Sequence, residues 1–310
     1  MTAGGLSGGL LKAPKSLVVF TAGAILAGLV PLSGGFDPSF LGAFVIYFVW
    51  ITLAVSWNLT GGFGGLFNLG LVAFFGLGAV VGGAGLQSGI PLAAMVPISA
   101  LSGATLGALL IPTFRLKSFY FAVATFVVPY MIKPLVEVTS GTSVFRVPGA
   151  EILGSSQLYY SGLALAVASV FGVYLMMRSK VGFALRTIGS DEVASASVGV
   201  NVGAYKAVAL VVSGALAALA GLYYLEIAGT ADTTIFQNLS FSLLPLFMVI
   251  IGGTGTLEGP VVGALVFSAL NYFVTSQLPG STLDVFILSL AVVAVALFRP
   301  RGLVARRRRN

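Results

Sequence analysis

The sequence contains no cysteine and no histidine, and only 8% of its residues are charged. Without these two residue types there are no disulfides, thiolate nucleophiles, Cys/His metal sites or histidine acid–base catalysis. Most classes of enzyme are thereby excluded. A soluble protein covers its surface with about 25% charged residues. This chain cannot do so, and we therefore expect its outer surface to face lipid.

Apolar residues, by contrast, make up 57% of the 310 residues, and 41 residues are glycine. The mean hydropathy is +1.04. Helical membrane proteins use glycine to bring helices close together. The sequence therefore predicts an all-α fold, a polytopic transmembrane helical bundle of about eight to ten spans.

A helix needs about 20 apolar residues to cross the ~30 Å hydrocarbon core. We identify ten candidate spans by this rule, separated by glycine, proline or charged residues. They are 16–33, 39–60, 63–84, 91–113, 118–136, 158–177, 203–228, 239–253, 259–277 and 283–298. The third and eighth are short or interrupted by glycine, which indicates re-entrant or broken helices. The first lacks a clear cleavage site and is predicted to be an uncleaved span.

The net charge is +7, and the basic residues occur in clusters. The clusters are Lys12 and Lys15; Arg115 and Lys117; Arg178, Lys180, Arg186 and Lys206; and Arg299, Arg301 and Arg306 to Arg309. Ten spans place every cluster on one side, which the positive-inside rule makes cytoplasmic. Segments 137–157 and 229–238 are then expected outside. A basic run can indicate nucleic-acid binding, but here it favours a cytoplasmic tail and no nucleic-acid partner.

This topology predicts three regions along the chain. Residues 1–15 form a cytoplasmic N-terminal segment, residues 16–298 a transmembrane domain, and residues 299–310 a basic cytoplasmic tail. The chain also shows a weak internal sequence similarity, because 61–66 (GGFGGL) and 252–257 (GGTGTL) share the pattern GGxGxL. Both lie at predicted cytoplasmic turns, which fits a parallel internal duplication. Chance in a glycine-rich chain is the alternative.

The longest strongly polar stretch between spans is 178–205. Asp191 and Glu192, with Ser190, supply N-cap chemistry and acidic residues for the first turn of a helix. We predict a short helix over 193–198 that Gly199 ends. This cytoplasmic element is either a solvated loop or a docking element for a soluble partner.

The same stretch carries a resemblance. The run 182–192 (GFALRTIGSDE), followed by Ala194, Ala196 and 199–201 (GVN), resembles the coupling-loop signature of branched-chain amino acid ABC transporter permeases. Further segments are similar to that family in the same order: 57–62 (WNLTGG), 74–79 (FFGLGA), 120–122, 139–141, 213–221 and 252–260 (GGTGTLEGP). The resemblance covers about residues 40 to 300, and the chain looks more like the LivM-type subunit than its LivH-type partner.

The resemblance implies a complex in the prokaryotic plasma membrane. It would contain two permease subunits, as a homodimer or with a LivH-like partner, two cytoplasmic ATPases and an extracytoplasmic solute-binding protein. This chain lacks the GxxxxGK[ST] phosphate-binding motif, so it is expected to be no enzyme, with no catalytic residue, metal or cofactor and with ATP bound by its partners. The residues implied in coupling are Arg186, Gly189, Asp191, Glu192, Ala196 and Gly199, with the two acids pairing with basic groups on the ATPase.

A zwitterionic amino acid needs a polar route without strong charge. Asn58, Asn68 and Thr125 are the candidates, and interhelical hydrogen bonding is the alternative for each. The sequence also departs from the family, because Leu66, Asn68 and Leu71 occupy positions where many members carry Gln, Ser and His. This departure makes the predicted pathway less polar or its specificity different.

Three residues are predicted on the face toward the binding protein: Arg146, Glu226 and Asp232. Lys133 and Glu137 have the i,i+4 spacing of a helical ion pair near the outer end of a span, although Lys133 could instead snorkel.

The function expected from the resemblance is ATP-driven import of branched-chain amino acids, with urea, short amides or another small solute as the alternative cargo. An ion-coupled secondary transporter is disfavoured, because such proteins place acids mid-membrane and all nine acidic residues here lie at or near span ends. A membrane scaffold without transport is disfavoured by the docking-helix signature.

Overall fold

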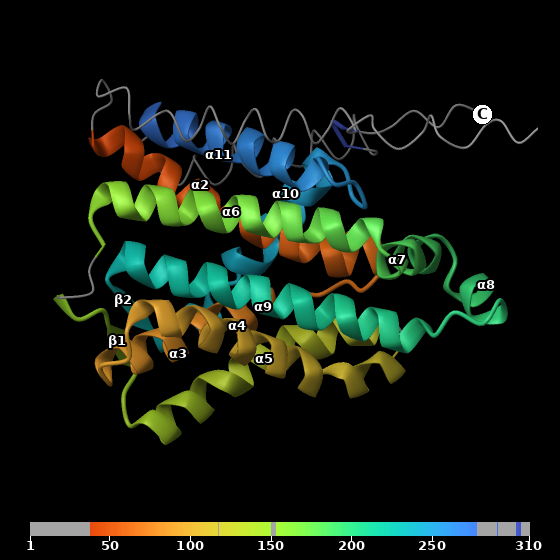
Figure 1. Cartoon of the computed structure of the whole chain (residues 1–310), viewed down its shortest axis with the longest axis horizontal. Helices are drawn as coiled ribbons and strands as arrows, with labels where there is room; N and C mark the ends of the chain where they lie inside the picture. The colour runs from red at the N-terminus through yellow and green to blue at the C-terminus, as the bar shows by residue number, and fades with distance from the viewer. Residues whose placement is uncertain (1–37, 117, 150–152, 278–289, 291–301, 305–310) are drawn as a thin grey trace, which may run out of the picture.

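The fold is a bundle of long helices running between two ends of the molecule (Figure 1). The computed structural model describes residues 38–116, 118–149, 153–277, 290 and 302–304. The longer helices are α2 (Pro38–Trp57), α3 (Leu71–Gln87), α4 (Leu92–Leu109), α5 (Ser118–Ser140), α6 (Ser155–Arg178), α9 (Val202–Ala228), α10 (Ser240–Gly252) and α11 (Gly259–Gln277).

Short elements complete the described chain. They are the π-helix η2 (Asn58–Phe63), the 3-10 helices η3 (Ile111–Arg115) and η5 (Thr233–Gln237), the helices α7 (Lys180–Ser190) and α8 (Glu192–Ser197), and the strands β1 (Val144–Arg146) and β2 (Thr230–Asp232). The helices α7 and α8 lie at one end of the bundle, called here the α8 end. The two strands lie at the other, called the sheet end.

Helices are found in all eight predicted spans that fall on described residues, which confirms the all-α prediction. Five helical segments are long and apolar enough to cross a membrane: Phe44–Phe63, Leu92–Arg115, Phe119–Ser140, Ser155–Arg178 and Val202–Ala228. Three shorter apolar helices accompany them. The predicted spans 16–33 and 283–298, apart from residue 290, lie outside the described residues, as do the segment 1–15 and most of the tail 299–310.

The predicted third span begins later than expected. The sequence predicts a helix over 63–84, but α3 starts at Leu71, and residues 64–70 are irregular. The expectation of a broken helix is therefore confirmed. Its physical cause is visible in the sequence, since glycines at 61, 62, 64, 65 and 70 weaken helix formation over this stretch.

The centre of the bundle is α9, which packs most extensively against α3 and α4 (Figure 1). Small residues set these contacts. A Cβ added at Gly221 would lie 1.9 Å from the main-chain oxygen of Phe75, and one at Gly103 would lie 2.2 Å from that of Gly214. Side chains at these positions would force the helices apart, so the high glycine content is used as expected of a membrane bundle.

The two ends of the bundle agree with the predicted sidedness. Because Gly107 of α4 packs against Leu210 and Val211 of α9, the end of α4 and Arg115 lie beside the start of α9 at the α8 end. At the other end β1 pairs antiparallel with β2, with Val144 opposite Asp232. The two segments predicted to lie outside thus meet at the sheet end.

Candidate docking element and transport pathway

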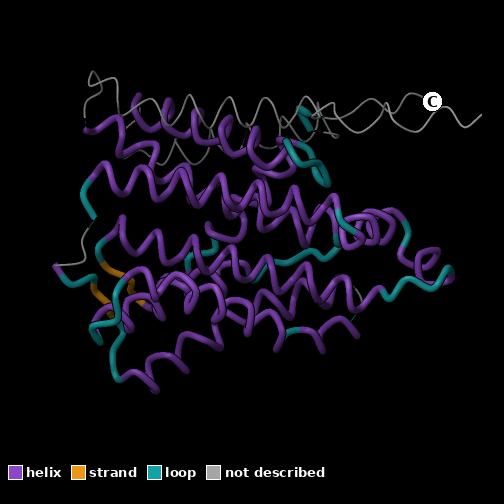
Figure 2. Tube along the Cα trace, viewed as in Figure 1, coloured by secondary structure: helices purple, strands orange, loops and turns teal. Residues whose placement is uncertain are grey.

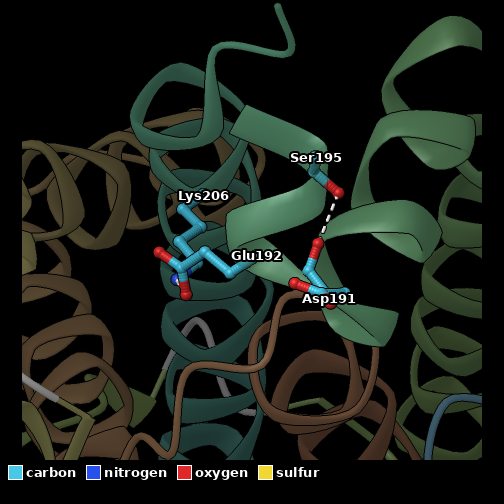
Figure 3. Close-up of polar contacts among 4 residues, drawn as sticks. All are labelled: Asp191, Glu192, Ser195 and Lys206. Carbon is cyan, nitrogen blue, oxygen red and sulfur yellow. Dashed lines mark hydrogen bonds and ion pairs between the residues drawn. The ribbon is translucent and has the colours of Figure 1, made fainter. Parts of the chain in front are cut away.

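The polar stretch 178–205 folds into two short helices joined at Asp191. The carboxylate of Asp191 accepts a hydrogen bond from the N–H of Ala194 at 2.9 Å and so caps α8. Its main-chain oxygen accepts from the hydroxyl of Ser195 at 2.7 Å (Figure 3). Gly199 ends the turn with φ +86°, a conformation that favours glycine. The predicted helix, its cap and its terminator are confirmed.

Glu192 fastens this helix to the bundle. Its carboxylate lies 2.6 Å from the ammonium of Lys206 at the start of α9 (Figure 3). Lys206 is buried, with 7% of its surface exposed, while the side chain of Glu192 is 58% exposed. Both acidic residues that we expected to pair with an ATPase therefore have partners within this chain.

The surface beside α8 carries exposed apolar side chains and a hollow. Phe183 and Val198 are 72% and 79% exposed, although water surrounds this end in the predicted topology. A hollow of about 440 Å³ opens beside them. Its lining residues are Lys180, Phe183, Ala184, Val198, Gly199, Val200, Asn201 and Tyr205. Exposed apolar patches outside the membrane mark binding surfaces.

The remaining predicted coupling residues lie on the same two helices. Arg186, Gly189 and Ala196 are exposed. Gly189 also approaches η2 closely, because a Cβ added there would lie 2.6 Å from the main-chain oxygen of Phe63. The element is therefore held at two points, by the Glu192–Lys206 pair on α9 and by the backbone contact with η2.

Two of the three predicted pathway residues are engaged in structural hydrogen bonds. The amide of Asn58 donates to the main-chain oxygen of Thr256 at 2.8 Å and accepts from the N–H of Gly255 at 3.0 Å. Thr125 donates to the main-chain oxygen of Ala122 at 3.0 Å and accepts from the N–H of Leu69 at 3.2 Å. For Asn58 and Thr125 the structural alternative accounts for the polar atoms of the side chains.

Asn68 differs from these two. Its side chain is fully buried, and its Oδ1 accepts from the N–H of Gly70 at 2.9 Å. The Nδ2 has no hydrogen-bond partner among the described residues. Its main-chain oxygen accepts from the indole N–H of Trp57 at 2.8 Å. Among the three candidates, Asn68 therefore has unused hydrogen-bonding capacity within the described chain.

The three residues predicted to face the binding protein have different surroundings. Arg146 is exposed on β1, and Asp232 caps η5 by accepting from the N–H of Thr234 at 2.7 Å. Glu226 does not lie on this face, because it is buried within the bundle with 5% of its surface exposed. It sits on a buried side of α9, which charge counting along the sequence does not reveal.

Lys133 and Glu137 do not pair with each other as predicted. Lys133 donates to the side-chain oxygen of Gln237 at 3.0 Å, and Glu137 accepts from the hydroxyl of Thr233 at 2.5 Å. Both bonds tie α5 to η5. The i,i+4 spacing was a correct guide to the shared face of α5, but partners 104 and 96 residues away take both side chains.

Sequence reasoning missed the Lys206–Glu192 pair. The sequence carries a weak signal for this pair, because Lys206 is a charged residue at the start of a long apolar run. No group of three or more acidic or metal-binding side chains that could hold a metal ion occurs in the described part of the chain.

Comparison with known proteins gives matches over most of the chain. The model of the family "Branched-chain amino acid transport system / permease component" matches residues 39–296. The high-affinity branched-chain amino acid transport system permease protein LivM of Salmonella typhimurium is 26% identical, covering 83% of this chain and 68% of the relative. The LivM of Escherichia coli is 25% identical with the same coverage.

Sugar permeases match as well: the fructose import permease protein FruG of Bifidobacterium longum is 26% identical, covering 71% of this chain and 70% of the relative. The ribose import permease protein RbsC of Haemophilus influenzae is 33% identical over 110 residues, a third of each chain. No solved structure matches this chain.

Proposed function

Because the chain belongs to the family of branched-chain amino acid transport system permease components, we propose that it is the LivM-type permease subunit of an ATP-driven importer. It is a multi-pass membrane protein of the ABC permease family. We place it in the prokaryotic plasma membrane with both termini cytoplasmic. Its proposed partners are two ATPases, a second permease subunit, LivH-like or identical, and an extracytoplasmic solute-binding protein.

The observation that carries the proposal is the combination of the LivM relatives with the α7–α8 element. These relatives match along 83% of the chain at 25–26% identity, and the fructose permease matches along 71% of it at 26% identity. The exposed Phe183 and Val198 beside a hollow provide an apolar surface for an ATPase. Charged contacts at the rim would add only about 0–1 kcal/mol each, so the apolar contact should dominate docking.

The attachments of this element suggest how it acts. Glu192 connects α8 to α9, and Gly189 rests against η2, which leads into the helix break. A displacement of α7 and α8 by closing ATPases would therefore reach two elements of the bundle together. Rigid-body switching between two packed states is the expected mode of transport, with ATP bound and hydrolysed by the partners.

The proposal is tested by uptake of labelled leucine in cells with and without this chain, with the partner ATPases and binding protein present. Urea, a short amide and ribose are measured alongside. Loss of leucine uptake on deletion is the expected result. Loss of only urea, amide or ribose uptake would keep the permease role and reject the amino acid cargo. Unchanged uptake of all four solutes would contradict the proposal.

A further inference from the structure

The chain interrupts its helical structure at residues 64–70, between η2 and α3 (Figure 2). α3 has 17 residues, so at about 1.5 Å per residue it is ~25 Å long and falls short of the ~30 Å hydrocarbon core. Since Phe63 lies against Gly189 of α7 and Gly70 lies against Thr125 of α5, the irregular segment runs from the α8 end into the bundle before α3 begins. Irregular backbone at membrane depth is tolerated only where protein buries it or where it lines a water-filled cavity.

One side of this segment is fixed to the bundle. The N–H of Leu69 donates to the hydroxyl of Thr125, and the indole of Trp57 donates to the main-chain oxygen of Asn68. A Cβ added at Gly70 would lie 2.2 Å from the main-chain oxygen of Thr125, so the backbones are in direct contact. The segment is therefore held in place by α2 and α5.

The other side is open. Phe67 is 41% exposed and Gly65 is exposed, although their neighbours Leu66 and Asn68 are buried. The Phe67 ring packs edge-on against Trp57, with centroids 5.7 Å apart and planes at 88°. Part of this aromatic side chain is therefore exposed at a place where the backbone is irregular. Open irregular backbone at this depth fits a solute path better than a lipid-facing surface.

The chemistry of the segment limits what it can bind. Residues 58–70 contain no charged side chain, so a solute with net charge would find no counter-charge there. The Nδ2 of Asn68, the next residue, is fully buried and has no hydrogen-bond partner among the described residues, so it lies behind the open side and not on it. An exposed aromatic ring in an uncharged segment suits the aliphatic part of a solute without net charge.

We propose that the open side of residues 64–70, centred on Phe67, is a wall of the solute path that contacts the aliphatic side chain of the transported amino acid. This assignment rests on the proposed import of branched-chain amino acids. Phe67 would be a specificity-determining residue, favouring leucine-like solutes over alanine. Urea, which has no aliphatic part, would gain nothing from it.

The absence of cysteine from the chain allows a direct test. Phe67→Cys introduces a single thiol, and the complete complex, assembled with cysteine-free partners, is treated with a charged, water-soluble methanethiosulfonate. Val167→Cys is the matched control, since Val167 is also 41% exposed but lies midway along α6. We expect labelling at position 67, at least severalfold slower during leucine transport, and little labelling at 167. No labelling at 67, or labelling that leucine transport does not slow, would overturn the assignment.

Two further measurements complete the test. Phe67→Ala should lower the ratio of leucine to alanine uptake about tenfold, as expected for losing apolar contact with several carbons, while Phe67→Leu should retain most of it. An unchanged ratio in Phe67→Ala would overturn the assignment, as would an efficient disulfide between Phe67→Cys and a cysteine in the second permease, which would make this surface a subunit contact. If the unmodified complex imports no leucine, the proposed function itself fails.

Discussion

Replacing Asn58 by alanine separates a structural role from a transport role at this position. The amide joins η2 to the loop after α10 through two hydrogen bonds, to the main-chain oxygen of Thr256 at 2.8 Å and from the N–H of Gly255 at 3.0 Å. These partners are almost 200 residues away in the chain. Asn58→Ala removes both bonds and leaves the two main-chain groups without their partner.

The expected cost follows from these bonds. Side-chain hydrogen bonds within membrane bundles contribute about 0.6 kcal/mol on average, and an unsatisfied buried group costs about 1–3 kcal/mol. Asn58 is buried, but Gly255 and Thr256 are partly exposed, so water can replace part of what is lost. We expect Asn58→Ala to destabilise the protein by about 1–3 kcal/mol.

The assay combines stability with transport. The thermal midpoint of the purified complex should fall by a few degrees, while the KM for leucine in complexes that remain assembled stays unchanged. Thr105→Val is the control, since its hydroxyl makes only an exposed local bond to Leu101, and its midpoint should not move. A raised KM with unchanged stability would refute the reasoning and make Asn58 a solute contact.

Three further predictions concern the α7–α8 element. Glu192→Gln should lower uptake per ATP hydrolysed about fivefold, because it weakens the pair with Lys206 by about 1 kcal/mol. The double variant Glu192→Lys with Lys206→Glu should recover part of the lost uptake per ATP. Gly189→Ala should destabilise the protein by about 1–3 kcal/mol, since the added Cβ would clash with η2. Gly203→Ala is the control: its added Cβ would meet no atom closer than 3.8 Å, and it should stabilise the protein by about 0.5–1 kcal/mol. Thermal unfolding distinguishes the two variants. Gly199→Val should strain the turn by about 1–2 kcal/mol and uncouple uptake from ATP hydrolysis, and unchanged uptake per ATP would contradict this.

Local features of the fold could be predicted from the sequence because their causes are local. The cap by Asp191 and the end of the turn at Gly199 depend on residues within a few positions of α8. The break before α3 follows from glycines in the break itself. Apolar length located the spans for a similar reason, since crossing a membrane is a requirement on one continuous segment.

Partners distant in sequence could not be predicted in this way. Lys133 and Glu137 have ideal helical spacing, yet both turn to η5, because hydrogen bonds to another element fix α5 to the bundle. Glu226 lies near the end of its helix, where an acidic residue is expected to face water, but the packing around α9 buries it. Spacing defines which face of a helix a residue occupies, and only the packing of other helices decides what that face meets.

The two segments that share the pattern GGxGxL, 61–66 and 252–257, are in contact in the structure. Both motifs lie at the α8 end and lead into helices, α3 and α11, that run toward the sheet end. They also touch, because a Cβ added at Gly62 would lie 2.7 Å from the nitrogen of Gly255. Gly189 presses on the main-chain oxygen of Phe63, the next residue. A continuous backbone contact thus joins α7 to both motifs. A side chain at Gly62, Gly189 or Gly255 would separate these elements. We therefore expect the small size of these glycines to be needed for transmitting motion from α7 and α8 to the helix break.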